Sequence, residues 1–350
     1  MENKKITIII VAYNSRIKIV DCLESIYCQN YPENLVKIIV IDNNSADSTV
    51  GYVREKYPQV KLIKNKTNLG FAAANNQGYY LAKKNKSDYL FLANDDIILK
   101  PDCLSHLIKT MAADKKTAAV QAKLLLYPQK DKINSFGNST HYLGFAFCNY
   151  YKCQDNLGIT KSFATPYPSG AAVLIKMSAL EQVGLFDERL FMYHEDVDLG
   201  WRLNLAGYKV LLDPLAVVYH KYNYSKAKYK FYYMDRNRLM VLLENYRVLT
   251  IMLILPMLLI MEIGIILFSL KNGWFREKIK GYFWILSHWP LILSRRLNTQ
   301  FKIRKVKDKE VIKLFVSAIK FQEIDNPILK FLINPLMQLY WLIVKKIIFW

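Results

Sequence analysis

The sequence predicts an α/β fold with a mostly parallel sheet, followed by a helical C-terminal region that associates with a membrane. Three observations predict it. Short apolar runs alternate with segments of helical period over residues 1–126, which is typical of strands joined by right-handed helical crossovers. The last third of the chain holds the long apolar stretches and most of the basic excess. A chain of 350 residues is long enough for two units, which we place at residues 1–245 and 246–350.

The expected strands are short and rich in β-branched residues, and the segments between them carry apolar residues at helical spacing. The strands are expected at residues 6–11, 36–41, 60–63, 89–93 and 118–126, and the helices at residues 16–29, 46–57, 71–84 and 101–114. In such a sheet, ligands bind beyond the carboxyl ends of the strands. The residues that follow each strand are therefore the candidate site.

Amide and carboxylate side chains follow four successive strands. The residues at the strand ends are Ala12, Tyr13 and Asn14, then Asp42, Asn43 and Asn44, then 65–70, and finally Asn94, Asp95 and Asp96. Asp95 and Asp96 would repel each other after a buried strand unless a cation or hydrogen-bond donors lie between them. The alternative is that these two aspartates form a solvated turn before a helix.

No Gly-rich phosphate-binding loop follows any of the expected strands. This argues against a dinucleotide-dependent enzyme and against a P-loop nucleotidase. A divalent cation, Mg²⁺ or Mn²⁺, held by carboxylates would instead suit a diphosphate ligand. Such ions prefer oxygen ligands and neutralise the charge of a leaving group.

The net charge of +20 is unevenly distributed along the chain. Residues 221–350 hold 23 Lys and Arg against 8 Asp and Glu, a net charge of +15, whereas residues 1–220 hold 26 against 21. Basic residues beside apolar segments suit an anionic membrane surface better than nucleic acid, so we expect no nucleic-acid partner. The five cysteines are scattered, and the N-terminus shows no signal-peptide pattern. We therefore expect reduced thiols and a first unit that stays in the cytoplasm.

Apolar stretches dominate the chain after residue 246. Residues 248–270 are long enough to cross a bilayer, but Pro256 interrupts them and Glu262 would be costly at mid-membrane. Residues 281–293 and 326–350 mix aromatic, basic and apolar residues in the manner of interfacial helices. The sequence leaves open whether residues 248–270 span the bilayer or lie in its interface, and a soluble helical subdomain is the alternative. We expect the protein at the cell membrane with its first unit on the cytoplasmic side.

Six ordered motifs resemble glycosyltransferase family 2, and most of all its rhamnosyltransferase-like branch. They are VAYNS (11–15), VIDNNSADST (40–49), NLGFAAANNQG (68–78), LANDDIIL (92–99), the segment 169–210 with its FMYHEDVDLGWRL stretch, and VVYHKYNYS (217–225). The resemblance covers residues 5–245. It implies a GT-A fold with a Rossmann-like sheet. It also implies an inverting transfer of a sugar from a nucleoside diphosphate sugar to an acceptor hydroxyl.

The resemblance also implies roles for individual residues. Asp42 would accept a hydrogen bond from a pyrimidine base, and Asp95 would meet the ribose. Asp96 and His220 would hold the divalent metal, in a signature whose first position is Asn94 here. The full set expected to bind the nucleotide sugar is Ala12, Tyr13, Asn14, Asp42, Asn68, Asn76 and Asp95.

Asp196 would be the general base on the acceptor side. An acceptor hydroxyl has a high pKa, so a carboxylate within hydrogen-bond reach must take its proton during attack. His194 and Glu195 are expected to contact the acceptor or to support Asp196. Trp201 would offer a ring on which a sugar packs, or would be a core residue. The three carboxylates at positions 195, 196 and 198 also suit a helix N-terminus without any catalytic role.

The donor implied by the resemblance is a UDP- or dTDP-linked sugar such as rhamnose. The acceptor would be a glycan or a lipid-linked molecule used in cell-surface polysaccharide or glycoconjugate assembly. Two rival functions are a nucleotidyltransferase, which would normally show a basic Gly-rich loop after the first strand, and an inactive membrane scaffold. The presence of Asp42, Asp96, Asp196 and His220 together argues against the scaffold.

Overall fold

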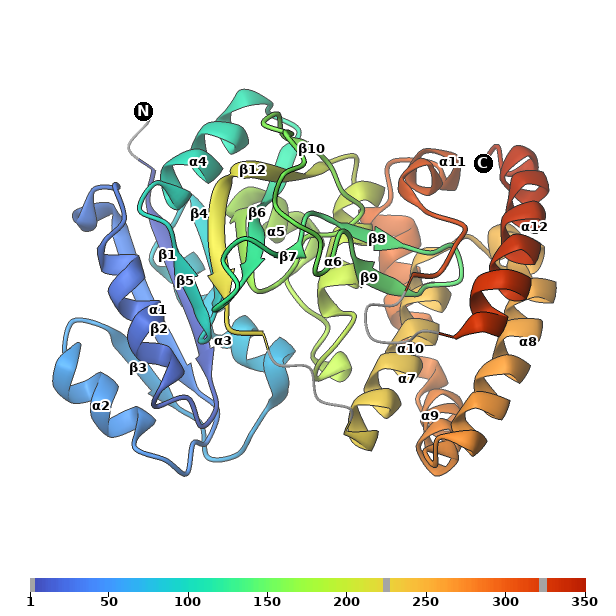
Figure 1. The fold of residues 1–350 in the computed structure, drawn as a ribbon, viewed down its shortest axis with the longest axis horizontal. Helices are drawn as coiled ribbons and strands as arrows, with labels where there is room; N and C mark the ends of the chain where they lie inside the picture. Colours follow the sequence, from blue (N-terminus) through green and yellow to red (C-terminus); the bar gives the residue numbers. More distant parts are fainter. Residues whose placement is uncertain (1–3, 223–226, 321–325) are drawn as a thin grey trace.

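The computed structural model describes residues 4–222, 227–320 and 326–350 (Figure 1), so the last three residues of the motif at 217–225 lie outside the described residues. Its centre is a mixed sheet with the strand order β10-β12-β6-β11-β4-β1-β2-β3, in which β5 also pairs with β12 and β7 with β6. A separate pair, β8 and β9, forms a small hairpin. The strands are β1 (Ile6–Ala12), β2 (Val36–Asp42), β3 (Lys61–Lys64), β4 (Tyr89–Asn94), β5 (Ile97–Leu99), β6 (Thr117–Leu126), β7 (Ile133–Ser135), β8 (Asn138–Thr140), β9 (Ala146–Cys148), β10 (Phe163–Ala164), β11 (Ala172–Lys176) and β12 (Lys209–His220).

The four strands at one end of the sheet are parallel, as predicted. β1 pairs with β2 so that Ala12 lies beside Asp42, and with β4 so that Val11 lies beside Asn94. β3 continues the parallel order next to β2. The carboxyl ends of these strands therefore meet at one edge of the sheet, the lower edge in Figure 1.

One strand that the sequence did not predict runs antiparallel to its neighbours. β11 lies between β4 and β6 and is antiparallel to both, while β6 and β12 are parallel to each other. Ala172, the first residue of β11, pairs with Ala93 near the end of β4. The segment that leads into β11 therefore lies at the same edge as the ends of β1, β2 and β4.

Helices cover both faces of the sheet, and the four predicted ones are present with ends that differ by at most three residues. Successive residues of a strand point to opposite faces. Ile8 and Ile10 of β1 pack in a cluster with α1 and α4, whereas Ile9 packs in a second cluster with α3, α5 and α6. These helices are α1 (Lys18–Tyr27), α2 (Thr49–Lys56), α3 (Gly70–Lys84), α4 (Cys103–Ala113), α5 (Met177–Val183) and α6 (Glu195–Leu205), with short 3₁₀ turns at Glu33–Leu35 and Glu188–Leu190.

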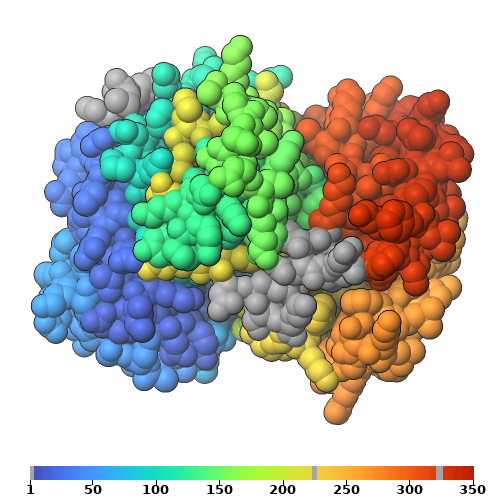
Figure 2. Space-filling view, viewed as in Figure 1, coloured from blue at the N-terminus to red at the C-terminus, as the bar shows by residue number. Residues whose placement is uncertain are grey.

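The C-terminal region is helical, as predicted, and lies at the opposite end of the molecule from β2 and β3 (Figures 1 and 2). A buried cluster joins Trp201 of α6 and Tyr246 to Ile254, Met337 and Trp341 of this region. The division of the chain at residues 245 and 246 stays a prediction. The helices are α7 (Lys228–Asn245), α8 (Val248–Lys271), α9 (Phe275–Ser287), α10 (Trp289–Asn298), α11 (Asp308–Val311) and α12 (Asn334–Ile347), with further helical turns at Thr299–Ile303, Ile312–Leu314 and Leu329–Ile333.

Candidate active site

The ends of β1 and β2 form one side of the candidate site. Asp42 is fully buried, and its Oδ2 accepts a hydrogen bond from the Ser45 N–H at 3.1 Å. Its Oδ1 is also buried and has no hydrogen-bond partner among the residues that the structure describes. A buried carboxylate oxygen without a partner costs free energy. Asp42 is therefore suited to accept a hydrogen bond from a ligand at this edge.

Asn14 links the end of β1 to the loop that follows β2. Its Oδ1 accepts from the Ala46 N–H at 2.8 Å, and its own N–H donates to Ser45 Oγ at 2.9 Å. Asn14 has a φ of 51°, a conformation that asparagine tolerates better than most residues. The preceding residue Tyr13 is 52% exposed, whereas Ala12 is buried in the strand. The Tyr13 ring is thus available to a ligand at the strand ends, and Asn14 fixes the backbone beneath it.

The loop before α3 places Asn68 on this side but not Asn76. Asn68 Oδ1 accepts from Asn43 Nδ2 and from the Gly70 N–H, both at 2.9 Å, and Asn68 is exposed. Asn76 lies in α3, where its Nδ2 donates to Phe186 O and Glu188 Oε1 and its Oδ1 accepts from the Phe186 N–H. Its amide is therefore occupied in holding the segment around Phe186. The prediction that Asn76 binds the nucleotide sugar is corrected by these contacts.

Asp95 lies in the tight turn between β4 and β5 and points toward the end of β1. Its carboxylate accepts a hydrogen bond from the Ser15 hydroxyl. Burial and the neighbouring Asp96 charge raise the pKa of Asp95 to about 6. Ser15 was not among the predicted site residues, although it belongs to the VAYNS motif.

Asp96 and His220 lie in contact, as their predicted shared role requires. His220 Nε2 is 3.1 Å from Asp96 Oδ1, and Lys18 Nζ is 3.5 Å from Asp96 Oδ2. Burial acts to raise the pKa of Asp96, but the hydrogen bond to His220 and the charges of His220 and Lys18 outweigh it, and that pKa lies below its usual range. The second ring nitrogen of His220, Nδ1, is 2.9 Å from Asn134 Oδ1.

These contacts fit a divalent cation. When Nδ1 donates to Asn134, the lone pair of Nε2 faces the Asp96 carboxylate, and a proton or a cation is needed between the two groups. Within residues 4–222, 227–320 and 326–350, no group of three His, Cys, Asp or Glu side chains is placed to hold a metal ion. Asp96 and His220 would thus be two protein ligands, and the other positions would be left to a diphosphate and water.

Asp196 is the second residue of α6 and reaches the same edge of the sheet. Its Oδ1 accepts from the Val197 N–H at 2.8 Å. Burial raises the pKa of Asp196, and the backbone N–H groups of Val197 and Gly170 lower it in part. Gly170 precedes Ala171, whose carbonyl accepts from the Asn94 N–H at 3.0 Å. Gly170 therefore contacts Asp196, and the next residue, Ala171, is hydrogen-bonded to Asn94 at the start of the turn that carries Asp95 and Asp96.

The three residues predicted near Asp196 are all buried. His194 Nε2 lies 3.2 Å from Gly144 O, and burial lowers the pKa of His194 to about 4. Burial and the Asp196 charge raise the pKa of Glu195, whose Oε2 has no hydrogen-bond partner in the described part of the chain. His194 and Glu195 thus adjoin Asp196 from within the protein, which fits a supporting position better than direct contact with an acceptor.

Trp201 does not face the site. Its ring makes edge contacts with Tyr246 at 4.6 Å and with Phe315 at 4.8 Å between ring centres, and it is 2% exposed. The prediction of an acceptor contact for Trp201 is therefore wrong, and the core alternative holds. The neighbouring Arg202 is fully buried and pairs with Asp198 at 2.8 Å.

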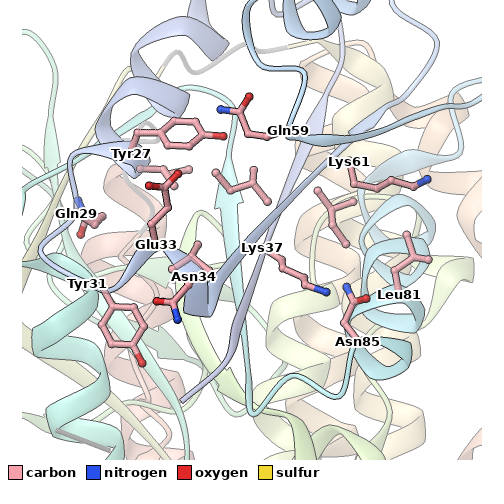
Figure 3. Close-up of a pocket in the computed structure, with 14 residues that line it drawn as sticks. Tyr27, Gln29, Tyr31, Glu33, Asn34, Lys37, Gln59, Lys61, Leu81 and Asn85 are labelled. Atoms are coloured by element: carbon pink, nitrogen blue, oxygen red, sulfur yellow. The ribbon is translucent and has the colours of Figure 1, made fainter. Parts of the chain in front are cut away.

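A large surface pocket lies away from this site. It has a volume of about 840 Å³ and opens at the amino ends of β2 and β3, at the other edge of the sheet. Figure 3 shows Tyr27, Tyr31, Glu33, Lys37 and Lys61 around it. None of the predicted site residues lines this pocket, so the candidate site remains at the carboxyl edge.

Comparisons with known proteins show what the chain is similar to. A family model described as "Glycosyl transferase family 2" matches residues 7–184. The chain is 29% identical over 216 residues to an N-acetylglucosaminyl-diphospho-decaprenol L-rhamnosyltransferase of Mycobacterium tuberculosis. The matched region is 56% of this chain and 70% of that protein. It is 27% identical over 214 residues to a poly-beta-1,6-N-acetyl-D-glucosamine synthase of Staphylococcus epidermidis, over 61% of this chain and about half (48%) of the synthase. Among solved structures, GalNAc-T7 with UDP, GalNAc and Mn²⁺ is similar in fold, with a TM-score of 0.55 and 16% identity over 69% of this chain and 48% of that chain.

Proposed function

The chain belongs to glycosyltransferase family 2, and from that premise we propose that it moves a sugar from a UDP- or dTDP-linked donor to an acceptor hydroxyl with inversion. One observation carries the proposal. The Asp42 oxygen that has no partner among the described residues, the Asp96–His220 contact and the Asp196 carboxylate all lie at the carboxyl edge of one sheet. Donor and acceptor could therefore meet between them.

Each side of this site would have its own task. Asp42 would accept a hydrogen bond from the base, and Tyr13, Asn14, Asn68 and Asp95 would bind the rest of the nucleoside. Asp96 and His220 would hold Mg²⁺ or Mn²⁺, which supplies charge neutralisation to a departing diphosphate. GalNAc-T7, which is similar in fold, was solved with UDP and Mn²⁺, and this supports both the proposed nucleotide and the proposed metal.

Asp196 would carry the proton transfer. As the acceptor oxygen bonds to the anomeric carbon, its proton passes to the Asp196 carboxylate, and the bond between that carbon and the diphosphate oxygen breaks on the opposite face. The configuration inverts, and no covalent enzyme intermediate is formed. Burial of Asp196 suits this role, because a raised pKa makes its carboxylate a stronger base.

A panel of nucleotide sugars tests the proposed function. Purified protein is mixed with UDP-, dTDP- and GDP-linked sugars, each with Mn²⁺, Mg²⁺ or EDTA, and both thermal stability and release of the nucleoside diphosphate are measured. We expect stabilisation and slow turnover with at least one UDP- or dTDP-sugar, and loss of both in EDTA. Equal responses with and without metal would contradict the proposed metal site.

Base selection should depend on Asp42. Uracil and thymine present an N3–H donor, whereas cytosine presents an acceptor at this position. Hydrogen bonds to charged groups contribute about 1.5–3 kcal/mol, so we expect Asp42→Asn to reduce the preference for UDP over CDP by about 10-fold or more. Titration calorimetry with UDP and CDP measures this. Asp47→Asn in the same loop is the control, because Asp47 is bound to the Arg16 and Thr49 backbone N–H groups instead, and an equal change in both variants would contradict the assignment.

The C-terminal helices support attachment to a membrane. The most apolar 18-residue window of α8 has a mean hydropathy of 2.7, and only 22% of that window is buried, so the helix is long and apolar enough to cross a bilayer. Its exposed apolar side chains are Val248, Leu249, Met252, Leu255, Leu259, Ile260, Ile263, Leu267 and Leu270. Together with the net charge of +15 in residues 221–350, this face suits a bilayer with anionic headgroups.

We propose that α8 lies in the membrane interface. Glu262 of α8 is paired with Arg238 of α7 and Lys278 of α9, and it also accepts from Tyr282. α7 in turn packs on α6 of the catalytic unit. A spanning α8 would carry this charged cluster and its neighbours toward the bilayer centre, which is costly. An interfacial α8 keeps the cluster on the protein side.

A groove beside α8 supports a lipid-linked acceptor. It has a volume of about 630 Å³, lies between α7, α8 and α9, and is lined by aliphatic side chains with Glu262 and Tyr282 as its polar members. Leu259, Ile263 and Leu286 of this groove are also exposed. A hydrocarbon chain could therefore pass from a bilayer into the groove. The relative that acts on N-acetylglucosaminyl-diphospho-decaprenol is consistent with an acceptor of this class.

Vesicle flotation tests the attachment. We expect the protein to float with vesicles of anionic and zwitterionic lipids and to bind zwitterionic vesicles more weakly, because each basic residue near an anionic surface contributes about 1 kcal/mol. Leu259→Glu with Leu267→Glu should reduce flotation without lowering thermal stability, because both side chains are exposed. Tyr80→Glu, at an exposed position on α3, is the control. A protein that stays at the bottom of the gradient with both vesicle types would remove the support for a lipid-linked acceptor.

A further inference from the structure

The backbone is strained just before α6, in the turn of residues 190–194 that we call the base turn. Phe191, Tyr193 and His194 have φ values of 60°, 67° and 65°. Residues other than glycine rarely adopt positive φ, and each such residue costs about 1–3 kcal/mol. Such a turn persists only when contacts from outside hold it. Asp196 follows the turn by two residues, so the shape of the turn determines where α6 begins.

Asn237 of α7 makes the main contacts with the base turn. It is fully buried, and its Nδ2 lies 2.8 Å from Leu190 O, 2.9 Å from Met192 O and 2.8 Å from Tyr193 O. Three carbonyl oxygens thus converge on one amide nitrogen. A carboxylate or an aliphatic side chain in its place offers them no N–H donor.

Arg236 fixes the orientation of the Asn237 amide. Its Nε and Nη2 donate to Asn237 Oδ1 at 2.9 and 2.6 Å, and Nη2 also donates to Arg189 O at 2.7 Å. If the Asn237 amide were reversed, its NH₂ group would face the guanidinium and its oxygen would face three carbonyls. Only one orientation therefore satisfies both groups, and Asn237 cannot rotate away from the base turn.

The base turn also contacts the donor side of the site. The Phe191 carbonyl accepts from the Ala72 N–H at 3.2 Å, and a Cβ at Gly70 would lie 2.5 Å from the Phe191 ring. The same ring stacks on Tyr233 of α7 at 5.0 Å between centres. The turn is therefore packed between the start of α3, next to Asn68, and the helix that carries Asn237.

We propose that Asn237 is a positioning residue that holds the base turn in its strained form and thereby sets the Asp196 carboxylate at the acceptor hydroxyl. This inference rests on the proposed role of Asp196 as the general base. Asn237 touches neither donor nor acceptor in this arrangement and acts only through the backbone of the turn.

Two variants and a matched control test the proposal. Asn237→Asp keeps the shape of the side chain but removes the N–H donors, and Asn237→Ala removes the amide. Asn245→Ala is the control, because Asn245 is equally buried on the same helix but donates to Asp198 Oδ1 and Val241 O instead of the turn. All three variants should lose thermal stability, so stability alone does not decide the matter.

Hydrogen exchange and kinetics provide the decisive readouts. We expect amide exchange in residues 190–196 to rise about 10-fold or more in both Asn237 variants, but not in the control. With the donor and acceptor found by the nucleotide-sugar panel, kcat should fall about 100-fold, as a displacement near 1 Å can cause. UDP affinity in the presence of Mn²⁺ should stay within about twofold, because only an interaction of the transition state is lost.

The possible outcomes separate this proposal from the proposed function. Unchanged exchange in the Asn237 variants would overturn the holding role, and that measurement needs no substrate. Raised exchange with an unchanged kcat would overturn the positioning role. If the unaltered protein turned over no nucleotide sugar, the proposed function would fail and the inferred link to catalysis with it, while the exchange data would still decide whether Asn237 holds the turn.

Discussion

Replacing Asp196 by asparagine is expected to lower the rate of sugar transfer strongly while nucleotide binding remains. The asparagine keeps the shape of the side chain and can still accept from the Val197 N–H, as Asp196 Oδ1 does at 2.8 Å. It cannot take a proton from an acceptor hydroxyl. General base catalysis contributes about 10²–10⁴-fold, so we expect kcat to fall by at least about 100-fold. Initial rates of nucleoside diphosphate release with acceptor, together with UDP titration in Mn²⁺, measure both effects.

Asp198→Asn provides the matched control for this variant. Asp198 lies two residues further along α6 and is buried in its pair with Arg202. The control should therefore unfold at a lower temperature, whereas its folded fraction should retain most of its kcat. Normal turnover by the Asp196→Asn protein, or an equal loss of kcat in both variants, would contradict the role of Asp196 as the base.

The pH dependence of kcat/KM in the unaltered protein should reflect the protonation of the Asp196 carboxylate. Burial raises the pKa of Asp196 above the value of about 3.9 for a free aspartate. Below its folded-state pKa the group is protonated and cannot accept a proton, so kcat/KM should fall as the pH is lowered through that value. The acidic limb should therefore lie well above pH 4 and should be absent from the residual activity of Asp196→Asn. A limb at or below pH 4 would mean that another group limits the rate.

The parallel half of the sheet followed from the sequence because its signals are local. The runs at 6–11 and 36–41 are mostly apolar and rich in β-branched residues, which is typical of buried parallel strands. β11 was not predicted because the connection before it, residues 127–171, has little periodicity. Nothing local in the sequence therefore indicates that the chain returns between β4 and β6, antiparallel to both. The polar residues after β1, β2 and β4 did meet at one edge, since parallel register brings those ends together.

Individual site residues were harder to assign because their partners lie far away in the chain. Asn75 and Asn76 are adjacent in one helix, and nothing local shows that Asn76 bonds to Phe186 and Glu188, 110 and 112 residues later. Trp201 follows the carboxylates of α6, but its neighbour Phe315 belongs to the C-terminal region. Likewise, nothing in the polar loop that contains Asn134 predicts its contact with His220, 86 residues later. Strand ends locate a site, whereas long-range packing decides which side chains face it.

Replacing Asp96 by alanine is the second change with a large expected effect, and it should remove the metal dependence of nucleotide binding. Asp96 is the carboxylate in contact with His220 and Lys18, and without it the diphosphate would meet only the His220 ring and the Lys18 ammonium. Loss of an outer partner of a metal ligand typically costs about 10–100-fold in metal affinity, so loss of the ligand itself should cost at least as much. UDP affinity measured with Mn²⁺ and with EDTA should become nearly equal in Asp96→Ala.

A graded series distinguishes a metal ligand from a residue needed only for folding. Asn134→Ala removes the partner of His220 Nδ1 at 2.9 Å but leaves Asp96 and His220 in place. It should weaken the response to Mn²⁺ by less than Asp96→Ala does. Asp96→Asn, which keeps an oxygen but not the charge, should lie between the two, because a divalent cation gains more from a carboxylate than from a neutral amide. UDP binding that still depends on Mn²⁺ in Asp96→Ala would place the cation elsewhere, and the turn after β4 would then be the solvated turn that the sequence also allowed.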